Sequence, residues 1–260
     1  MTEKLSADQI KRQVQEDYGK VATGCCNTSA CCGGPTIKLT DLSNQLGYSQ
    51  QELASVVTGA NLGLGCGNPQ AIAQLQPGET VLDLGSGGGF DCFLAATKVG
   101  KNGKVIGVDM TAEMIFKARE NAKKQACENV EFRLGEIENL PVADNSVDVI
   151  ISNCVINLSP NKTRVWQEAY RVLKSQGRLA ISDVVLLQEL PDNLKEEFAY
   201  YSACISGASY VNDLRQQLCQ AGFSNIEIKP KEESKEFINN WAPGQNLADY
   251  LVSATITAIK

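Results

Sequence analysis

The sequence predicts an α/β protein with a doubly wound, Rossmann-like sheet. The first observation is the apolar run at residues 81–84, which ends in the glycine turn 85–89 and continues into an amphipathic stretch with Phe93 and Leu94. The second is that further apolar stretches follow in alternation with helical patterns. Strand, tight glycine turn and helix in this order form the first unit of a doubly wound sheet.

The remaining elements follow from the period of the apolar residues. Strands are expected at residues 104–108, 129–134, 147–152, 177–186, 224–229 and 250–259. Helices are expected over 1–23, from the capping box at 49–52, after Thr111 as the N-cap, over 161–173, and near 193–203 and 209–221. The chain then divides into an N-terminal region of helices and cysteine-bearing loops (1–78), a Rossmann-like core (79–187) and a small C-terminal region that we expect to bind the substrate and to supply the closing strands (188–260).

Charge and composition exclude several classes of function. The chain has 260 residues and a formal net charge of −6, which argues against a nucleic-acid partner, because phosphates call for a basic face. Its first 20 residues are polar with a helical pattern, and they contain neither a secretory signal nor a membrane span. We therefore expect a cytoplasmic monomer that acts on a small molecule, with no membrane and no nucleic-acid partner.

The glycine turn and two acidic residues indicate the ligand of the core. Dinucleotide enzymes carry a similar turn, so the turn alone does not identify it. Asp83, at the end of the first strand, would repel a pyrophosphate but favours a ligand with an ammonium and a sulfonium, such as S-adenosylmethionine. Asp109 closes the next strand, where a carboxylate can accept hydrogen bonds from ribose hydroxyls. The alternative is a tight turn with no ligand.

The cysteines indicate a second function. Ten cysteines in a cytosolic chain favour metal, metalloid or redox chemistry over disulfides, and the absence of histidine leaves thiolates as the soft ligands. Cys154 directly follows the fourth strand, and Cys66 and Cys204 lie in glycine-bearing loops that could fold over the same crevice. Three thiolates would form a trigonal soft-ligand site. Cys92 and Cys219 lie in helices beside apolar residues, and we expect both to fill the core.

The chain resembles the arsenite S-adenosylmethionine methyltransferases of the short bacterial type. The resemblance covers nearly the whole chain and includes Tyr18-Gly19-Lys20, the cysteine pairs at 25–26 and 31–32, residues 64–69, 81–91, 105–111 and 135–141, Ser182-Asp183 and residues 204–208. The glycine turn is general to S-adenosylmethionine enzymes. Gly65-Cys66-Gly67 together with residues 152–158 is specific to this family.

The resemblance implies a class I methyltransferase fold and a role for each matching residue. Asp83, Gly85, Ser86, Gly87, Asp109, Met110, Glu136, Ile137 and Asn153 would bind S-adenosylmethionine, and Cys66, Cys154 and Cys204 would bind arsenic(III). Three-sulfur ligation leaves the arsenic lone pair free for the methyl group. Transfer oxidises arsenic, so the redox thiols would be Cys25, Cys26, Cys31 and Cys32, with glutathione or a thioredoxin-like protein as reductant. The result would be arsenic detoxification.

Three other functions remain open from the sequence. A methyltransferase for an organic acceptor, such as a quinone or sterol, would use the same cofactor half. A thiol-rich protein that sequesters arsenic would bind arsenite without the cofactor, although the complete set of Asp83, Gly85, Gly87 and Asp109 speaks against it. A nucleic-acid methyltransferase is disfavoured by the acidic charge.

Overall fold

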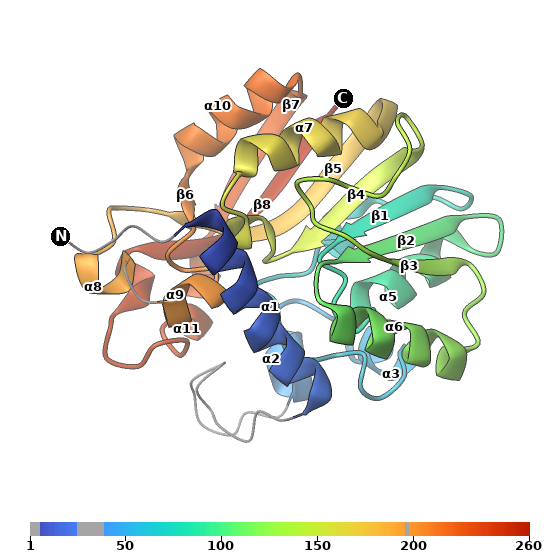
Figure 1. Cartoon of the computed structure of the whole chain (residues 1–260), viewed down its shortest axis with the longest axis horizontal. Coiled ribbons are helices and arrows are strands. Elements are labelled where there is room, and N and C mark those ends of the chain that lie inside the picture. The colour runs from blue at the N-terminus through green and yellow to red at the C-terminus, as the bar shows by residue number, and fades with distance from the viewer. Residues whose placement is uncertain (1–5, 25–38, 196–197) are drawn as a thin grey trace.

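The computed structural model describes residues 6–24, 39–195 and 198–260. Eight strands in this part of the chain form one sheet in the order β3-β2-β1-β4-β5-β8-β7, with β6 paired to β5 (Figure 1). The strands are β1 Thr80–Leu84, β2 Lys104–Asp109, β3 Val130–Leu134, β4 Val147–Asn153, β5 Leu173–Leu186, β6 Ser209–Tyr210, β7 Ser224–Lys231 and β8 Leu251–Ile259. Strands β1 to β6 pair in parallel, and β8 is antiparallel to both β5 and β7. The expected doubly wound sheet is confirmed.

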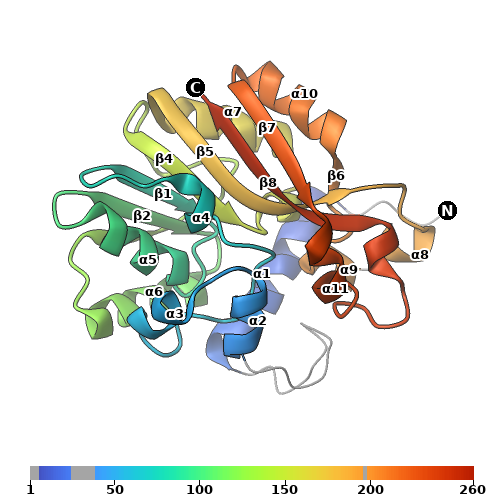
Figure 2. The same ribbon diagram turned by 180° about the vertical axis from the view of Figure 1, so that it is seen from behind.

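The helices of the described residues lie on both faces of this sheet and across its carboxyl-end edge. They are α1 Ala7–Thr23, α2 Leu39–Gln45, α3 Gln50–Ser55, α4 Gln70–Ala73, α5 Phe90–Val99, α6 Ala112–Gln125, α7 Lys162–Val172, α8 Asp192–Lys195, α9 Phe198–Ser202, α10 Val211–Ala221 and α11 Lys235–Ile238, with 3₁₀ turns at Ile156–Leu158, Glu232–Ser234 and Leu247–Asp249. Helices α7 and α10 cover the near face in Figure 1, and α4 and α5 lie on the face seen in Figure 2.

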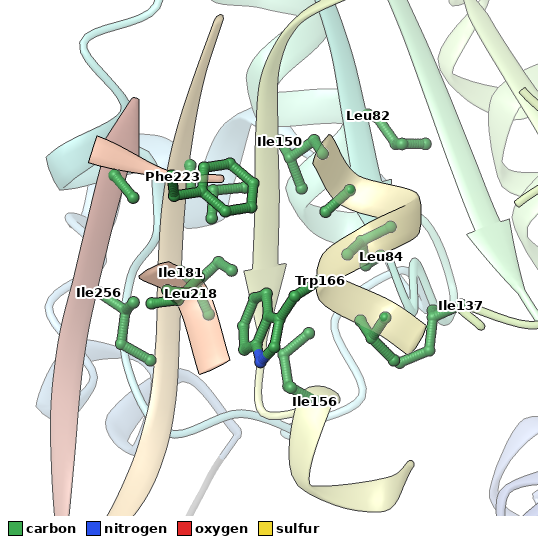
Figure 3. Packing of buried hydrophobic residues seen from close by; sticks show 14 of the residues in the cluster. Leu82, Leu84, Ile137, Ile150, Ile156, Trp166, Ile181, Leu218, Phe223 and Ile256 are labelled. Atoms are coloured by element: carbon green, nitrogen blue, oxygen red, sulfur yellow. The ribbon is translucent and has the colours of Figure 1, made fainter. Parts of the chain in front are cut away.

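The alternation of side chains along the strands builds a separate core on each face. Leu82 and Leu84 of β1 point into the cluster under α7 and α10, where Trp166 is fully buried (Figure 3). Val81 points to the opposite side, into the cluster that contains Phe93 of α5 and Ile115 of α6. Both faces of the parallel strands are therefore covered, as a near-continuous apolar strand sequence requires.

Several expected boundaries differ from the structure. In the region of the helix expected near 193–203, the described residues form α8 and α9, and residues 196–197 lie outside the described part of the chain. The fifth strand begins at Leu173, earlier than expected. The Ser49–Glu52 capping box is confirmed, with both reciprocal hydrogen bonds present. Thr111 holds the N-cap position of α6, but its side chain makes no capping bond to the helix. Asp109 instead accepts the Thr111 backbone N–H at 2.9 Å, so the acid predicted for the ribose also closes this turn.

A third apolar cluster lies beyond the carboxyl ends of the strands and positions the site. It joins Ile10 and Val14 of α1 with Leu46, Phe237 and Leu251, all buried. Cys66, Cys154 and Cys204 belong to this cluster. No helix in the described ranges is long and apolar enough to cross a membrane.

Candidate active site

The candidate site is a cavity of about 1210 Å³ where the strand order reverses between β1 and β4. Its walls come from α1, α2, the loop between α3 and α4, the glycine turn, the ends of β2 and β4, α9 and α11. The lining includes these residues expected from the sequence: Asp83, Gly85, Ser86, Gly87, Asp109, Met110, Ile137, Asn153, Cys154 and Cys204. The structure thus brings nearly all of the expected residues to one cavity, at the position where open α/β sheets bind ligands.

The glycine turn leaves no space for a side chain at its first residue. Gly85 has a φ of +72°, a left-handed conformation, and a Cβ placed there would collide with Val155. At Gly88 a Cβ would lie 2.8 Å from the carbonyl oxygen of Ala60. Ser86, in the same turn, lines the cavity, and its Oγ is buried without a hydrogen-bond partner. A narrow backbone cradle with an unpartnered hydroxyl fits a polar ligand such as S-adenosylmethionine.

Two buried acids form one end of the cavity. Asp83 is 3% exposed and Asp91 is 9% exposed, and both line the wall. Burial and the neighbouring Asp91 raise the pKa of Asp83 well above its usual value. Burial also raises the pKa of Asp91, to about 6, against hydrogen bonds that lower it. A cationic ligand would favour the ionised forms of both carboxyls, as expected for a site that binds an ammonium and a sulfonium.

Asp109 lies at the end of β2 with each carboxylate oxygen held by the backbone. Its Oδ2 accepts the Gly87 N–H and its Oδ1 accepts the Thr111 N–H, both at 2.9 Å. Burial raises its pKa, and these two hydrogen bonds act in the opposite direction. The glycine turn and the predicted ribose acceptor are therefore one rigid unit.

Glu136 lies differently from the sequence expectation. Its side chain forms an ion pair with Lys11 at 2.6 Å and is absent from the residues that line the cavity. Glu138, two residues further on, does line it and accepts the Ser159 hydroxyl at 2.7 Å. In an irregular segment after β3 the direction of a side chain cannot be read from spacing, and the structure places Glu138 at the cavity wall where the sequence predicted Glu136.

The sulfurs of Cys66 and Cys154 are bonded to each other, across a sequence separation of 88 residues. Cys154 lies directly after β4 at the cavity wall, and Cys66 is buried behind it, 1% exposed. The Cys204 thiol donates a hydrogen bond to the Cys154 carbonyl oxygen at 2.9 Å. The first two of the three cysteines expected to act together therefore form a disulfide, and Cys204 contacts Cys154 through its backbone carbonyl. The group of possible ligand atoms that lie within 4.8 Å of one another contains Cys66, Cys154 and Asp183, and the Cys204 sulfur is not part of it.

Two of these cysteines have a strained backbone. Cys154 has a φ of +58° and Cys204 a φ of +62°, in the left-handed region that non-glycine residues seldom occupy. Such residues cost about 1–3 kcal/mol each and persist where the surrounding structure over-determines them, often at functional sites. Burial, and secondarily Asp183, raise the pKa of the Cys204 thiol well above its usual value. The Asp183 carboxylate lies within 4.8 Å of the Cys66 and Cys154 sulfurs.

The Gly65-Cys66-Gly67 segment has a steric explanation. A Cβ at Gly65 would lie 2.9 Å from the Nδ2 of Asn153, and a Cβ at Gly67 would lie 2.8 Å from the Oγ of Ser182. Between them, the Cys66 N–H donates to Asn153 Oδ1 at 3.0 Å, and the Cys66 carbonyl accepts the Ser253 hydroxyl at 2.7 Å. Glycines on both sides let the loop approach β4, β5 and β8 closely enough to place the thiol.

Other expected cysteines have different outcomes. Cys92 is fully buried, as predicted, and its thiol also donates to Asp83 at 3.2 Å. The prediction for Cys219 is wrong, because its side chain is exposed on α10. The buried face of that helix is formed by Leu214 and Leu218, and the next residue turns away from it. Cys25, Cys26, Cys31 and Cys32 lie outside the described residues.

Two residues of the site, Tyr48 and Asp91, were not predicted from the sequence. The Tyr48 hydroxyl donates to Asp91 Oδ1 at 2.8 Å and accepts from Asn153 Nδ2 at 3.1 Å. Asp91 directly follows the glycine turn in the sequence, so its place at the start of α5 was a usable signal. Tyr48 reaches the site from the segment between α2 and α3, which no motif marks.

Comparisons with known proteins agree with this geometry. The model of a methyltransferase domain family matches residues 75–236. The arsenite methyltransferase of Halobacterium salinarum is 53% identical over 97% of this chain and 67% of its own length. The arsenite methyltransferase of Mus musculus is 34% identical over 86% of this chain, which spans 60% of the mouse protein.

Solved structures give the same family and fold. An arsenic(III) S-adenosylmethionine methyltransferase from Chlamydomonas reinhardtii superposes with a TM-score of 0.65 at 33% identity, over 84% of this chain and 73% of its own. Phosphoethanolamine N-methyltransferase 2 of Haemonchus contortus, in complex with S-adenosyl-L-methionine, gives a TM-score of 0.63 at 19% identity, over 86% of this chain and 60% of its own, a likeness of fold alone. The chain belongs to the arsenite methyltransferase family, on the class I fold of S-adenosylmethionine-dependent methyltransferases.

Proposed function

We propose that this chain transfers methyl groups from S-adenosylmethionine to trivalent arsenic held by the thiolates of Cys66, Cys154 and Cys204. The observation that carries the proposal is the contact between the Cys66 and Cys154 sulfurs at the cavity that Asp83 lines. Arsenic(III) is thiophilic, and soft thiolate ligands suit it. Relatives named arsenite methyltransferases support the same substrate.

The residues of the chain would act mainly by holding the two reactants in one cavity. When bound, S-adenosylmethionine supplies an electrophilic methyl group, which the arsenic lone pair takes as the bond from that carbon to sulfur breaks. Asp83 and Asp91 would face the cationic groups of the methyl donor, Ser86 and Asp109 its polar groups, and Met110 and Ile137 its adenine. Positioning of this kind can supply about 7–11 kcal/mol of the barrier. No proton moves, so a chain without histidine needs no general base.

Thiols would complete the cycle. Gain of a methyl group raises arsenic(III) formally to arsenic(V), and two electrons must return before the next methylation. Two thiolates that couple to a disulfide release two electrons. Because the Cys66 and Cys154 sulfurs are bonded to each other, this pair is a candidate source of those electrons, in addition to the N-terminal cysteines. Two glutathione molecules, or a thioredoxin dithiol, would then reduce the disulfide and be oxidised in turn. The methylated products would serve arsenic detoxification.

Product analysis tests this function against its competitors. The purified protein is incubated with S-adenosylmethionine, glutathione and arsenite, and methylated arsenic is measured by chromatography with element-specific detection. We expect methylated products from the wild type and from Cys219→Ala, whose exposed thiol lies on α10 away from the site, and near-complete loss in Cys154→Ala. Full activity of Cys154→Ala would remove arsenic-thiolate chemistry from the mechanism. Arsenite binding without product would favour a sequestering protein.

A further inference from the structure

Tyr48 connects two parts of the cavity that carry different chemistry. Its ring is 4% exposed and packs edge-on against Phe90, with ring centroids 5.0 Å apart. Its hydroxyl donates to Asp91 at 2.8 Å and accepts from the Asn153 amide at 3.1 Å. A buried hydroxyl with one donor and one acceptor bond therefore lies between a carboxylate and a side-chain amide. The amide also reaches the carboxylate directly, but at the longer distance of 3.4 Å from Asn153 Nδ2 to Asp91 Oδ2.

One end of this connection is the acid pair. Asp91 and Asp83 line the same wall, both are buried, and each has its pKa raised by burial. The side-chain amide of Gln70 donates to the Asp91 backbone carbonyl oxygen at 3.0 Å and so holds the start of α5 in place. A cation in the cavity shifts the two carboxyls toward their ionised forms.

The other end is the loop that carries the first thiol. Asn153 accepts the Cys66 N–H with its Oδ1 at 3.0 Å, and its Nδ2 donates to the Gly67 carbonyl at 2.8 Å. Both bonds require the amide to present its oxygen to Cys66 and its nitrogen to Gly67 and Tyr48. If the amide were flipped, its NH₂ group would face the Cys66 N–H and its oxygen would face the Gly67 carbonyl oxygen, so both hydrogen bonds would be lost.

We propose that Tyr48 is a positioning residue that couples the methyl-donor site to the arsenic site. Ionised Asp91 accepts the Tyr48 proton, which leaves the hydroxyl oxygen free to accept from Asn153 and fixes the amide in the orientation that holds Cys66. Neutral Asp91 can donate a proton to Tyr48, and the Tyr48 proton then points toward Asn153 and favours the reversed amide. A cation beside Asp83 and Asp91 therefore orders the Cys66 loop. This inference rests on the proposed function.

Binding measurements test the coupling without turnover. The probes are arsenite and sinefungin, a nonreactive S-adenosylmethionine analogue with an amine in place of the sulfonium. Both are titrated into reduced protein by calorimetry at pH 5, below the Asp91 pKa of about 6, where the carboxyl is mostly neutral before a cation binds. In the wild type we expect saturating sinefungin to lower the arsenite Kd by about fivefold or more, and arsenite to tighten sinefungin by the same factor, as linkage requires. In Tyr48→Phe the factor falls below about twofold.

Two further variants complete the design. Tyr170→Phe removes a hydroxyl from a ring that packs on Phe223, outside the cavity, and keeps the wild-type coupling factor. Asp91→Asn acts at the other end of the path and loses the coupling as Tyr48→Phe does, so the test stands if Tyr48→Phe fails to fold. Coupling retained in a folded Tyr48→Phe, or absent from a wild type that binds both probes, overturns this inference alone. A reduced wild type that does not bind arsenite overturns the proposed function as well.

Discussion

The Oδ1 of Asn153 accepts the backbone N–H of Cys66 at 3.0 Å, so a side chain at the end of β4 fixes the loop that carries the first thiol. Cys154 is the next residue after Asn153, and its N–H donates to the Ser182 carbonyl of β5 at 2.8 Å. Two cysteines that are far apart in the sequence are thus positioned by neighbouring residues of one strand end. The end of β4 therefore positions two of the three cysteines of the site.

Gly65→Ala should damage the thiol site. The new Cβ would lie 2.9 Å from the Asn153 amide, which cannot move without losing Cys66, so we expect destabilisation by about 1–3 kcal/mol and weaker arsenite binding. Gly19→Ala is the matched control. Gly19 lies within α1, and its new Cβ would meet the Glu113 side chain at an ordinary contact distance of 3.5 Å. Replacing a helical glycine by alanine should therefore raise stability by about 0.5–1 kcal/mol. Urea unfolding measures both, and a Gly65→Ala variant as stable as wild type would contradict the steric account.

Ser86→Ala should change the stability of the protein and its cofactor affinity in opposite directions. The Ser86 hydroxyl is buried without a partner, so its removal should not destabilise the free protein and should stabilise it by up to about 1–3 kcal/mol. If the hydroxyl bonds the cofactor, the same change should weaken sinefungin binding by roughly 2- to 10-fold, the worth of one hydrogen bond. Thermal unfolding and calorimetry give the two numbers. Unchanged affinity would show that the cofactor does not use this hydroxyl.

The stability of the unliganded protein should fall as the pH rises from about 4 to 7. Asp91 has a folded-state pKa of about 6 against an ordinary 3.8, so the folded state holds its proton through this window while the unfolded state releases it. The folded state then binds more protons, and the free energy of unfolding decreases with pH. Urea unfolding at pH 5 and pH 7.5 should show a smaller decrease in Asp91→Asn. An equal decrease in both proteins would assign the effect to other groups.

Glu168→Gln should destabilise the fold without weakening arsenite binding. Glu168 is 1% exposed, pairs with Arg171 at 2.7 Å and accepts the Leu140 N–H at 2.9 Å. Loss of its charge leaves Arg171 partly uncompensated, and a cost of about 2–4 kcal/mol is expected from broken buried pairs. Glu168 does not line the cavity. The arsenite affinity, measured about 20 °C below the melting midpoint of the variant so that the protein is folded, should therefore be unchanged. Weaker binding by the folded variant would contradict the separation of site and scaffold.

The sequence predicted those parts of the site that lie at strand ends. Asp83, Asp109 and Cys154 each end or follow a strand, and parallel strands bring their carboxyl ends to one edge, so their convergence follows from topology alone. Gly65-Cys66-Gly67 was marked by its composition. The reason why this loop needs two glycines is its close approach to Asn153 and Ser182. That approach depends on packing across the sheet and cannot be read from the loop sequence itself.

The rest depends on tertiary contacts that local patterns do not encode. Tyr48 lies between two short helices and reaches Asp91 over 43 residues of sequence. Whether Glu136 or Glu138 lines the cavity depends on the path of an irregular segment after β3. Cys219 was assigned to the core because apolar residues adjoin it, although it lies one position beyond the buried face of α10.

Arsenic K-edge X-ray absorption on the reduced protein with one equivalent of arsenite tests the central claim, coordination by three thiolates, most directly. The account predicts three sulfur ligands and no oxygen ligand in the wild type, a loss of one sulfur in Cys204→Ser, and no change in Cys219→Ala. Two sulfurs in the wild type, or three sulfurs that persist in Cys204→Ser, would contradict arsenic ligation by Cys66, Cys154 and Cys204.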